Sequence, residues 1–191
     1  MNRQLFMGLT LTGGVMILLG MLSQGAGGQS SIEQATLRTI LLSKHNSYRT
    51  THHSPALTLN NSLNSTAESW AKQIATTGAF VHSSSTQRNG AGENLYVFYT
   101  TASIATDTLA NNAVKSWYDE VAKYNYANPG FATSTGHFTQ VVWKNSTQLG
   151  CGAAEGTKTL NGTQYKAFYV VCHYAPAGNV LGQFPANVLK P

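Results

Sequence analysis

The chain has 191 residues, with 12 Lys or Arg against 7 Asp or Glu and a formal net charge of +5. The basic residues are scattered along the sequence instead of forming the stripe that binds nucleic acid, so we expect no nucleic-acid partner. A mildly basic, soluble surface is the simplest interpretation of this charge. Weak contact with an acidic membrane surface or with cell-wall polymers stays open.

Residues 1–28 have the pattern of a secretory signal peptide. A single cation, Arg3, precedes an apolar stretch from Leu5 to Leu22, and residues 23–28 are small or polar. The stretch is close to the lower limit for a membrane span, so a transmembrane anchor is the alternative, but its glycines and small-residue exit favour cleavage. We therefore expect residues 29–191 to form one secreted, extracellular domain, since about 165 residues are enough for a single apolar core.

Three segments after the signal peptide have apolar residues at the three- and four-residue spacing of an amphipathic helix. They are residues 32–48, 62–74 and 106–121. The second helix is expected to be capped near Asn61 or Ser62. In the third, Glu120 follows Trp117 by about one turn and should lie beside the buried face.

Two later segments, 148–155 and 164–174, are rich in β-branched and aromatic residues and predict strands joined as a hairpin through Asn161-Gly162. Cys151 and Cys172 fall on opposite arms of this hairpin. An even number of cysteines in an oxidising compartment favours a disulfide, which would close a loop of about 20 residues and contribute roughly 3 kcal/mol. Two free buried thiols are the alternative. Sequons for N-glycosylation begin at Asn60, Asn64, Asn145 and Asn161.

Four titratable residues from separate segments form the candidate metal site. His82, Glu93, Glu120 and His137 supply two imidazoles and two carboxylates in a chain that has few such groups. Imidazole nitrogen is a good ligand for Zn²⁺, and a carboxylate can complete the shell or orient a histidine through its second nitrogen. With the two histidines as direct ligands and the two glutamates behind them, open positions would remain for water. A hydrogen-bonded network that only holds loops together is the alternative.

Two longer motifs, GHFTQVVW at 136–143 and YVVCHYAPAGN at 169–179, resemble the signatures of the CAP superfamily. This superfamily comprises cysteine-rich secretory proteins, antigen 5 allergens and pathogenesis-related proteins. The segment 124–131 is most similar to its fungal branch, the pathogenesis-related yeast proteins that bind and export sterols. The resemblance covers about residues 35–189. It implies an α+β fold, a three-layer α-β-α sandwich, with the four candidate metal residues around one central cleft.

An uncharged aromatic run, Tyr96, Val97, Phe98 and Tyr99, is a candidate for the edge of a lipid-binding groove. A strand packed on the core is the plainer interpretation. In sterol-exporting relatives a mobile loop near the first helices holds the sterol, and residues 55–61 would correspond to it here, without an aromatic residue. The sequence therefore predicts a secreted, non-enzymatic CAP-domain protein that binds sterols first and fatty acids second. A divalent metal in the cleft, with Zn²⁺ expected before Mg²⁺, completes this prediction.

Two other functions stay open. A metal-dependent peptidase or esterase would use His82 and His137 to hold the ion and a glutamate as base, although neither His-Glu-x-x-His nor Gly-x-Ser-x-Gly occurs in the chain. A defence or virulence protein that only interacts with a partner would need no metal. His52 and His53 are expected to be solvated, and His173 to be a plain hairpin residue where the family often has Asn or Ser.

Overall fold

The structure is a computed structural model and describes residues 32–191, so the predicted signal peptide at 1–28 lies outside the described residues. The elements follow in the order α1 (Gln34–Thr51), β1 (Thr58–Leu59), α2 (Asn61–Thr77), β2 (Gly92–Thr100), α3 (Thr106–Tyr118), the 3₁₀ helix η1 (Asp119–Lys123), α4 (Gly136–Val142), β3 (Gln148–Leu160), β4 (Thr163–Ala175) and α5 (Phe184–Asn187). In residues 32–191 no helix is both long enough and apolar enough to cross a bilayer.

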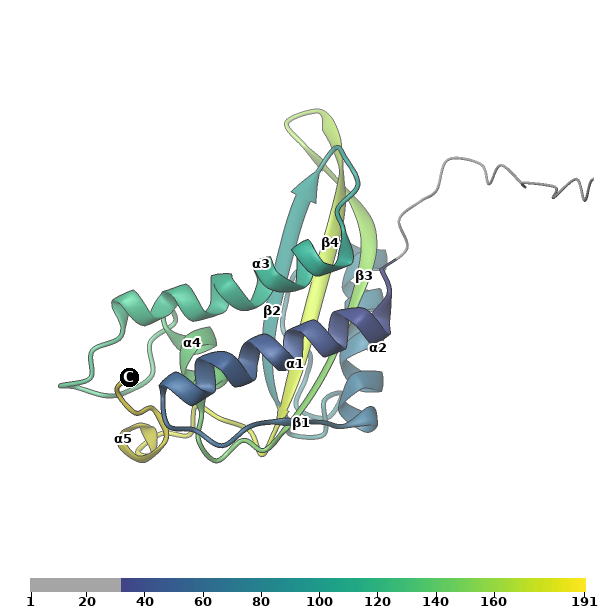
Figure 1. Cartoon of the computed structure of the whole chain (residues 1–191). Coiled ribbons are helices and arrows are strands. Elements are labelled where there is room, and N and C mark those ends of the chain that lie inside the picture. Colours follow the sequence, from purple (N-terminus) through teal and green to yellow (C-terminus); the bar gives the residue numbers. More distant parts are fainter. Residues whose placement is uncertain (1–31) are drawn as a thin grey trace, which may run out of the picture.

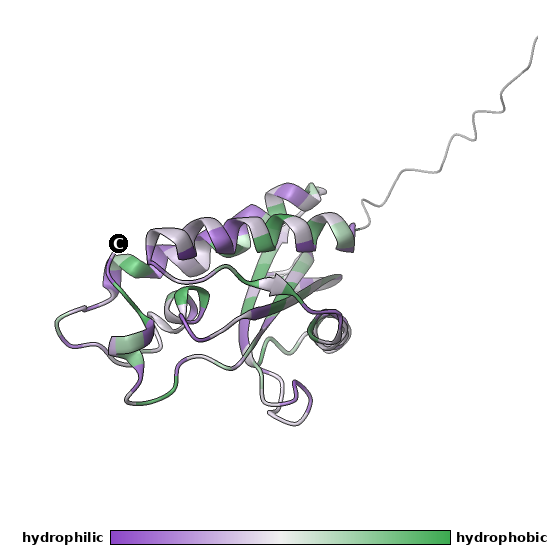
Figure 2. Cartoon of the chain, turned by 60° about the horizontal axis from the view of Figure 1, so that its bottom comes forward, coloured by the Kyte–Doolittle hydropathy of each residue, from purple (hydrophilic) through white to green (hydrophobic). Residues whose placement is uncertain are grey.

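The predicted three-layer α-β-α sandwich is confirmed. Four strands form one sheet in the order β1-β3-β4-β2, with β3 and β2 both antiparallel to β4. Helices α1 and α3 cover one face of this sheet and α2 covers the other (Figure 1; Figure 2). The fold is therefore α+β, with β2 and β1 at the two edges of the sheet.

Each face of the sheet has its own apolar core. The larger core lies under α1, α3 and α4 and includes Leu41, Trp117 and Phe138, while the smaller one lies under α2 and includes Ala71 and Ile74. Because successive strand residues point to opposite faces, the central strand β4 serves both cores. Phe168, Val170, Cys172 and Tyr174 enter the larger core, and Ala167, Tyr169 and Val171 enter the smaller one.

Helix α2 approaches the backbone of β3 directly because glycines occupy that face of the strand. A Cβ atom built at Gly150 would lie 2.2 Å from backbone atoms of α2, and one built at Gly152 would lie 2.3 Å from the Cα of Glu68. Real Cβ contacts are not that short, so only glycine fits there. This close approach fixes the position of α2, which carries residues of the polar network described below.

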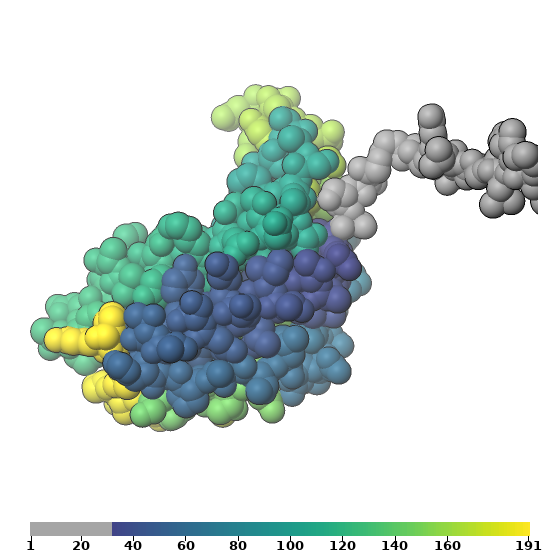
Figure 3. All heavy atoms as spheres, viewed as in Figure 1, coloured from purple at the N-terminus to yellow at the C-terminus, as the bar shows by residue number. Residues whose placement is uncertain are grey.

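The hairpin and the disulfide are also confirmed. Asn161 and Gly162 have φ of 49° and 78°, the positive values that a type I′ hairpin turn requires. Cys151 and Cys172 are direct register partners of β3 and β4 and form a disulfide with a sequence separation of 21. The tip of this hairpin projects beyond the helical layers (Figure 3).

The three predicted helices are present, with differences at their ends. The cap of α2 is Asn60, one residue before the expected position, and its Oδ1 accepts hydrogen bonds from the backbone N–H of Ser62 and Leu63 at 2.8 and 3.1 Å. The third helix ends as an α-helix at Tyr118 and tightens into η1. Glu120 therefore lies in η1 and not on a regular helical face.

His52 is not solvated, which corrects the prediction. Its ring is fully buried, its Nδ1 lies 2.8 Å from the carbonyl oxygen of Leu189 and its Nε2 lies 2.9 Å from the hydroxyl of Tyr118. Burial lowers the pKa of His52. The neighbouring His53 is exposed, as expected. Nothing local in the sequence distinguishes the two, because the partners of His52 come from distant segments.

A second buried histidine makes stability depend on pH. The ring of His45 is fully buried between the carbonyl of Leu41 and the hydroxyl of Tyr174, and burial lowers its pKa from 6.5 to about 4. Between about pH 6.5 and about pH 4, His45 therefore binds a proton in the unfolded chain but not in the folded chain. We expect stability to fall as pH falls through this window, by about 3 kcal/mol at most from this residue.

Urea denaturation at a series of pH values measures this loss. His52 acts in the same direction, whereas the carboxylates with lowered pKa, Glu68, Glu93 and Glu120, lose their contribution only below about pH 4.5. His45→Gln should flatten the slope above that pH, and His53→Asn, at an exposed site, should leave it unchanged. An unchanged slope in His45→Gln would contradict the assignment.

Candidate metal centre

The structure brings three of the four predicted metal residues to the wall of one cleft and places the fourth just behind it. His82 lies in the loop after α2, Glu93 near the start of β2, Glu120 in η1 and His137 at the start of α4. The cleft has a volume of about 220 Å³. It is lined by His82, Glu93, Asn94, Phe131, Thr133, Gly136, His137 and Asn179.

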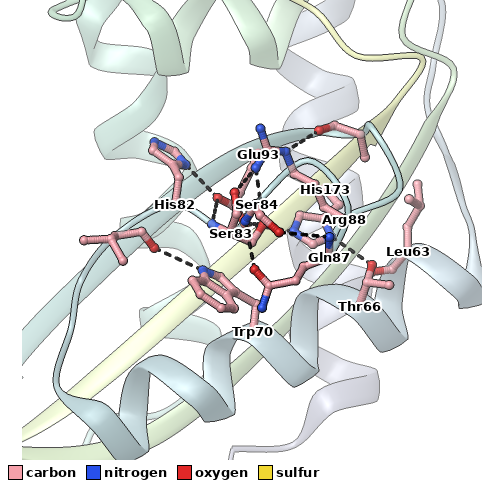
Figure 4. A network of polar contacts seen from close by, with 12 residues as sticks. Leu63, Thr66, Trp70, His82, Ser83, Ser84, Gln87, Arg88, Glu93 and His173 are labelled. Carbon is pink, nitrogen blue, oxygen red and sulfur yellow. Dashed lines mark hydrogen bonds and ion pairs between the residues drawn. The ribbon is translucent and has the colours of Figure 1, made fainter.

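Glu93 is held at the base of the cleft by four hydrogen bonds (Figure 4). Its Oε1 accepts from His82 Nδ1 at 2.6 Å and from the Ser83 backbone N–H at 2.9 Å. Its Oε2 accepts from the Ser83 hydroxyl at 2.7 Å and from His173 Nε2 at 3.0 Å. Burial alone would raise the pKa of Glu93, but the hydrogen bonds donated by His173, His82 and Ser83 outweigh it and hold that pKa far below its usual range.

His173 is the site residue that sequence reasoning missed. It was expected to be a plain hairpin residue, but its side chain is buried, and its Nδ1 lies 2.9 Å from the hydroxyl of Thr66 on α2. His173 is the register partner of Glu93 across β2 and β4. Strand order is the signal that could have found it, since pairing of these two strands puts the imidazole beside the carboxylate.

Glu120 holds His137 in a similar way. Its Oε1 accepts from His137 Nδ1 at 2.8 Å, and its Oε2 accepts from the backbone N–H of His137 and Phe138 at 2.9 and 3.1 Å. Burial alone would raise the pKa of Glu120, but these hydrogen bonds lower it. Trp117 stacks against the His137 ring with a centroid distance of 6.5 Å. The ring is therefore fixed from two sides.

Both cleft histidines leave the same nitrogen available. An ionised carboxylate can only accept, so Nδ1 of His82 and of His137 must donate to its glutamate. Each Nε2, which has no hydrogen-bond partner in residues 32–191, can bind a metal when it carries no proton. A carboxylate behind a histidine is the usual way to orient a metal-binding imidazole. In residues 32–191 no group of three or more His, Cys, Asp or Glu is placed to hold an ion together. An ion here would therefore take two protein ligands and complete its shell with water or a bound molecule.

The aromatic run does not line this cleft. Its residues belong to the edge strand β2 and alternate between the faces of the sheet. Tyr96 and Phe98 pack against the larger core, and Val97 and Tyr99 against the smaller one. The four side chains therefore do not form one continuous apolar wall.

Residues 55–61, expected to correspond to a sterol-holding loop, are held in place by hydrogen bonds and by strand pairing. Leu57 is buried, its N–H donates to Asn46 Oδ1 at 2.7 Å, and Asn46 Nδ2 donates back to its carbonyl at 3.1 Å. Strand β1 pairs with β3 through Thr58 and Leu59. A cavity behind this segment would require these bonds to open.

Of the seven large apolar side chains that are exposed in residues 32–191, five belong to segments that line the cleft. They are Phe80, Val81, Phe131, Val180 and Leu181, with exposed fractions of 42, 56, 52, 40 and 81%. Val81 precedes His82, Phe131 itself lines the cleft, and Val180 follows the lining residue Asn179. We call these five residues the apolar rim.

The four sequons differ in what their asparagines do. Asn64 is 5% exposed and its Oδ1 accepts a hydrogen bond from the Cys151 backbone at 2.9 Å, while Asn60 is engaged as the cap of α2. Asn145 and Asn161 are exposed. A glycan on Asn64 cannot be accommodated between α2 and β3.

We therefore expect glycans at Asn145 and Asn161 but not at Asn64 when the protein is secreted from a yeast host. Glycopeptide mass spectrometry measures the occupancy of each site. Thr163→Val removes the sequon while keeping Asn161, whose φ is positive, and should eliminate one glycan with little change in the thermal midpoint, because Thr163 is exposed at the start of β4. Substantial occupancy of Asn64 in folded protein would contradict the expectation.

The fold and the site define a secreted-type CAP domain, and comparison with known proteins agrees. Residues 42–174 match the model of the CAP family, described as the cysteine-rich secretory protein family, and the chain belongs to this family. Golgi-associated plant pathogenesis-related protein 1 of Homo sapiens is 38% identical over 153 residues, which cover 79% of this chain and 91% of that protein. Protein PRY2 of Saccharomyces cerevisiae is 37% identical over 152 residues, which cover 79% of this chain and 40% of that protein.

Among solved structures, the chain is similar to BmVAL-1, with a TM-score of 0.65 and 27% identity over 86% of this chain and 87% of that one. The CAP resemblance inferred from the two sequence motifs is thus confirmed, and its fungal side is represented by PRY2. Since this chain spans less than half of PRY2, what the rest of PRY2 does is not implied for it.

Proposed function

We propose that this is a secreted, non-catalytic CAP-domain protein that holds a divalent metal ion in its cleft and binds small apolar lipids, sterols before fatty acids. The observation that carries the metal proposal is the matched pair of histidines, each oriented through Nδ1 by a glutamate and each with Nε2 available. Calorimetric titration of the metal-free protein with Zn²⁺ tests it, with one saturable site as the expected result. Absence of saturable binding would overturn the proposal.

Zinc fits the residues better than magnesium. Imidazole nitrogen is a preferred ligand of Zn²⁺, whereas Mg²⁺ prefers an octahedron of oxygen ligands. The carboxylate oxygens that could serve Mg²⁺ are occupied by hydrogen bonds from His82, Ser83, His173 and His137. We therefore expect Zn²⁺ to bind and Mg²⁺ to compete poorly.

The apolar rim supports lipid binding. Exposed apolar side chains that concentrate around one site often mark a binding surface, and here five of them lie in the segments that line one cleft. Sterols are placed first because segment 124–131 resembles the fungal branch of the family, the pathogenesis-related yeast proteins that bind and export sterols. A lipid seated on the rim would bury its apolar body there and could place its polar end over the cleft.

A charge on the rim should weaken lipid binding, since the lipid would have to desolvate it. Phe131→Glu changes a residue that is 52% exposed, so folding should be unaffected. Leu160→Glu is the matched control, with a 37% exposed residue at the far hairpin tip. Saturable binding of radiolabelled sterol and fatty acid, with and without chelator, measures the effect. We expect Phe131→Glu to lose roughly tenfold in affinity and Leu160→Glu to lose none; equal binding by both variants would refute the rim as the lipid site.

A metal-dependent hydrolase fits the geometry less well. A general base needs a free lone pair aimed at water, but all four acceptor positions of Glu93 receive hydrogen bonds, and three of those on Glu120 do. Chelator-sensitive turnover of a peptide or ester, abolished by Glu120→Gln, would establish the enzyme instead. A partner-binding role without metal or lipid would be indicated if His82→Ala with His137→Ala, correctly folded, kept its partner and its biological effect.

A further inference from the structure

The outer surface of α2 carries a groove that the metal and lipid proposals do not use. It consists of two adjoining hollows of about 270 and 280 Å³. Both are lined by Ser65 and Ser69, which lie one helical turn apart, so the hollows continue into each other along the helix. We call this feature the α2 groove. Each hollow approaches the volume of small-molecule sites, which begins at roughly 300 Å³.

The sequence of α2 explains the composition of the groove. Ala67, Ala71 and Ile74 face the sheet, and the opposite stripe at four-residue spacing is Ser65, Ser69 and Gln73. The other wall comes from the loop after α2, where Gln87 and Ser84 bond to each other. The Ser84 N–H donates to Gln87 Oε1 at 2.9 Å, and the Gln87 N–H donates to Ser84 Oγ at 3.2 Å (Figure 4).

The groove is polar, and both of its ionised groups, Glu68 and Lys72, are paired. Its carboxylate, Glu68, accepts from Arg38 at 2.6 Å and from Lys72 at 2.5 Å. Since Glu68 is shared by two cations, one positive charge remains, so the groove does not suit a bare cation, and solvent around Lys72, which is 65% exposed, screens that charge too well for it to hold an anion tightly. Apart from Trp70, its lining residues are polar or charged, so it does not suit a lipid either.

The groove offers unused hydrogen-bonding groups beside an aromatic surface. Within residues 32–191, the Ser69 hydroxyl and the Gln73 side-chain amide have no hydrogen-bond partner, and the side-chain nitrogen of Gln87 has none. The indole N–H of Trp70 donates to the Val81 carbonyl at 3.1 Å, so ring carbons are what Trp70 offers to the groove.

We propose that the α2 groove binds a neutral oligosaccharide. A sugar ring has an apolar C–H face that packs on an aromatic ring and hydroxyls that both donate and accept, which matches Trp70 flanked by Ser69, Gln73 and Gln87. In the second hollow, where a second sugar unit would lie, Ser69 offers a donor and an acceptor, and Ser65, whose hydroxyl donates to the Asn61 carbonyl at 3.0 Å, offers an acceptor. Such a site would hold the protein on cell-wall or cell-surface glycans while its cleft remains open.

The fluorescence of this chain offers a direct readout. Trp117 and Trp143 are 2% and 1% exposed, whereas Trp70 is half-buried and lines the groove, so a sugar at Trp70 should change the emission of the most accessible tryptophan. The probes are soluble neutral oligosaccharides, namely a β-1,3-glucan hexamer, a mannotetraose, a cellotetraose and a chitotetraose, titrated up to millimolar concentrations.

We expect saturable binding of at least one of these probes, unaffected by chelator. Ser69→Arg, on the exposed helix surface, should fill the groove and weaken binding at least about tenfold. Ser43→Arg is the matched control, because Ser43 is exposed on α1 in the opposite layer. Loss in Ser69→Arg with retention in Ser43→Arg supports the proposal. No saturable binding of any probe, or equal binding by both variants, overturns it and leaves the metal and lipid proposals untouched.

Discussion

Replacing Arg49 by Ala is expected to destabilise the fold by roughly 4 kcal/mol or more, because several buried carbonyl groups would lose their donor at once. The side chain of Arg49 is fully buried. Its Nε donates to the Pro55 carbonyl at 2.8 Å, its Nη1 to Val141 at 3.0 Å and Trp143 at 2.8 Å, and its Nη2 to Ser146 at 2.8 Å. Burial lowers the pKa of Arg49 to about 10, which still leaves it charged at neutral pH.

These bonds connect the end of α1 to the last turn of α4, the helix that carries His137, and to the segment that follows it. Arg49→Lys keeps the charge but replaces a planar fork of donors by one ammonium, so it should lose an intermediate amount. Lys44→Ala, at an exposed position of the same helix, is the control and should change stability by less than about 0.5 kcal/mol. Urea denaturation followed by circular dichroism measures all three variants. A loss below about 1 kcal/mol in Arg49→Ala would show that water replaces the guanidinium at little cost.

The main helices and the hairpin were predictable from the sequence. The apolar spacing of the three main helices and the Asn161-Gly162 turn each follow from local chemistry, and the structure confirms them. The two cysteines could be paired because both lie on arms of the same hairpin. The grouping of His82, Glu93, Glu120 and His137 needed the family resemblance, because they come from four separate segments.

The contacts that depend on long-range pairing were not predictable. His173 reaches Glu93 only because β2 adds to the far side of β4, and no local pattern states that order. His52 bonds to a residue more than 60 positions away, and Arg49 to residues more than 90 positions away. The sequence around each of them therefore gives no indication that the side chain is buried. The aromatic run at 96–99 packs on both cores, as the plainer of its two interpretations expects, because a strand places its alternate residues on opposite faces whatever their chemistry; its part in lipid binding stays a prediction.

Removal of both cleft histidines, His82→Ala with His137→Ala, is expected to abolish Zn²⁺ binding to the folded protein. Each of these two side chains lines the cleft, donates from Nδ1 to a carboxylate that orients the ring, and offers Nε2 to an ion. His53→Asn removes an exposed histidine outside the cleft and is the matched control. Asparagine is chosen because position 53 has a positive φ of 55°, which asparagine tolerates. Calorimetric titration of the three proteins measures the effect, and thermal unfolding with and without Zn²⁺ checks it independently.

Substitution of a glutamate distinguishes a metal centre from a hydrogen-bonded network that only holds loops together. In Glu120→Gln an amide of the same shape replaces the carboxylate, but only one of its two terminal atoms can accept, so its NH₂ faces either His137 Nδ1 or the backbone N–H groups and the hold on His137 weakens. We expect Zn²⁺ affinity to fall roughly 10–100-fold while the fold is retained. If Glu120→Gln lowered only the stability and left Zn²⁺ affinity unchanged, the carboxylates would be structural and an ion would be bound without them. If Zn²⁺ affinity fell but sterol binding did not, the cleft would hold the metal and the rim the lipid as independent sites, which is the arrangement that their separate chemistry favours.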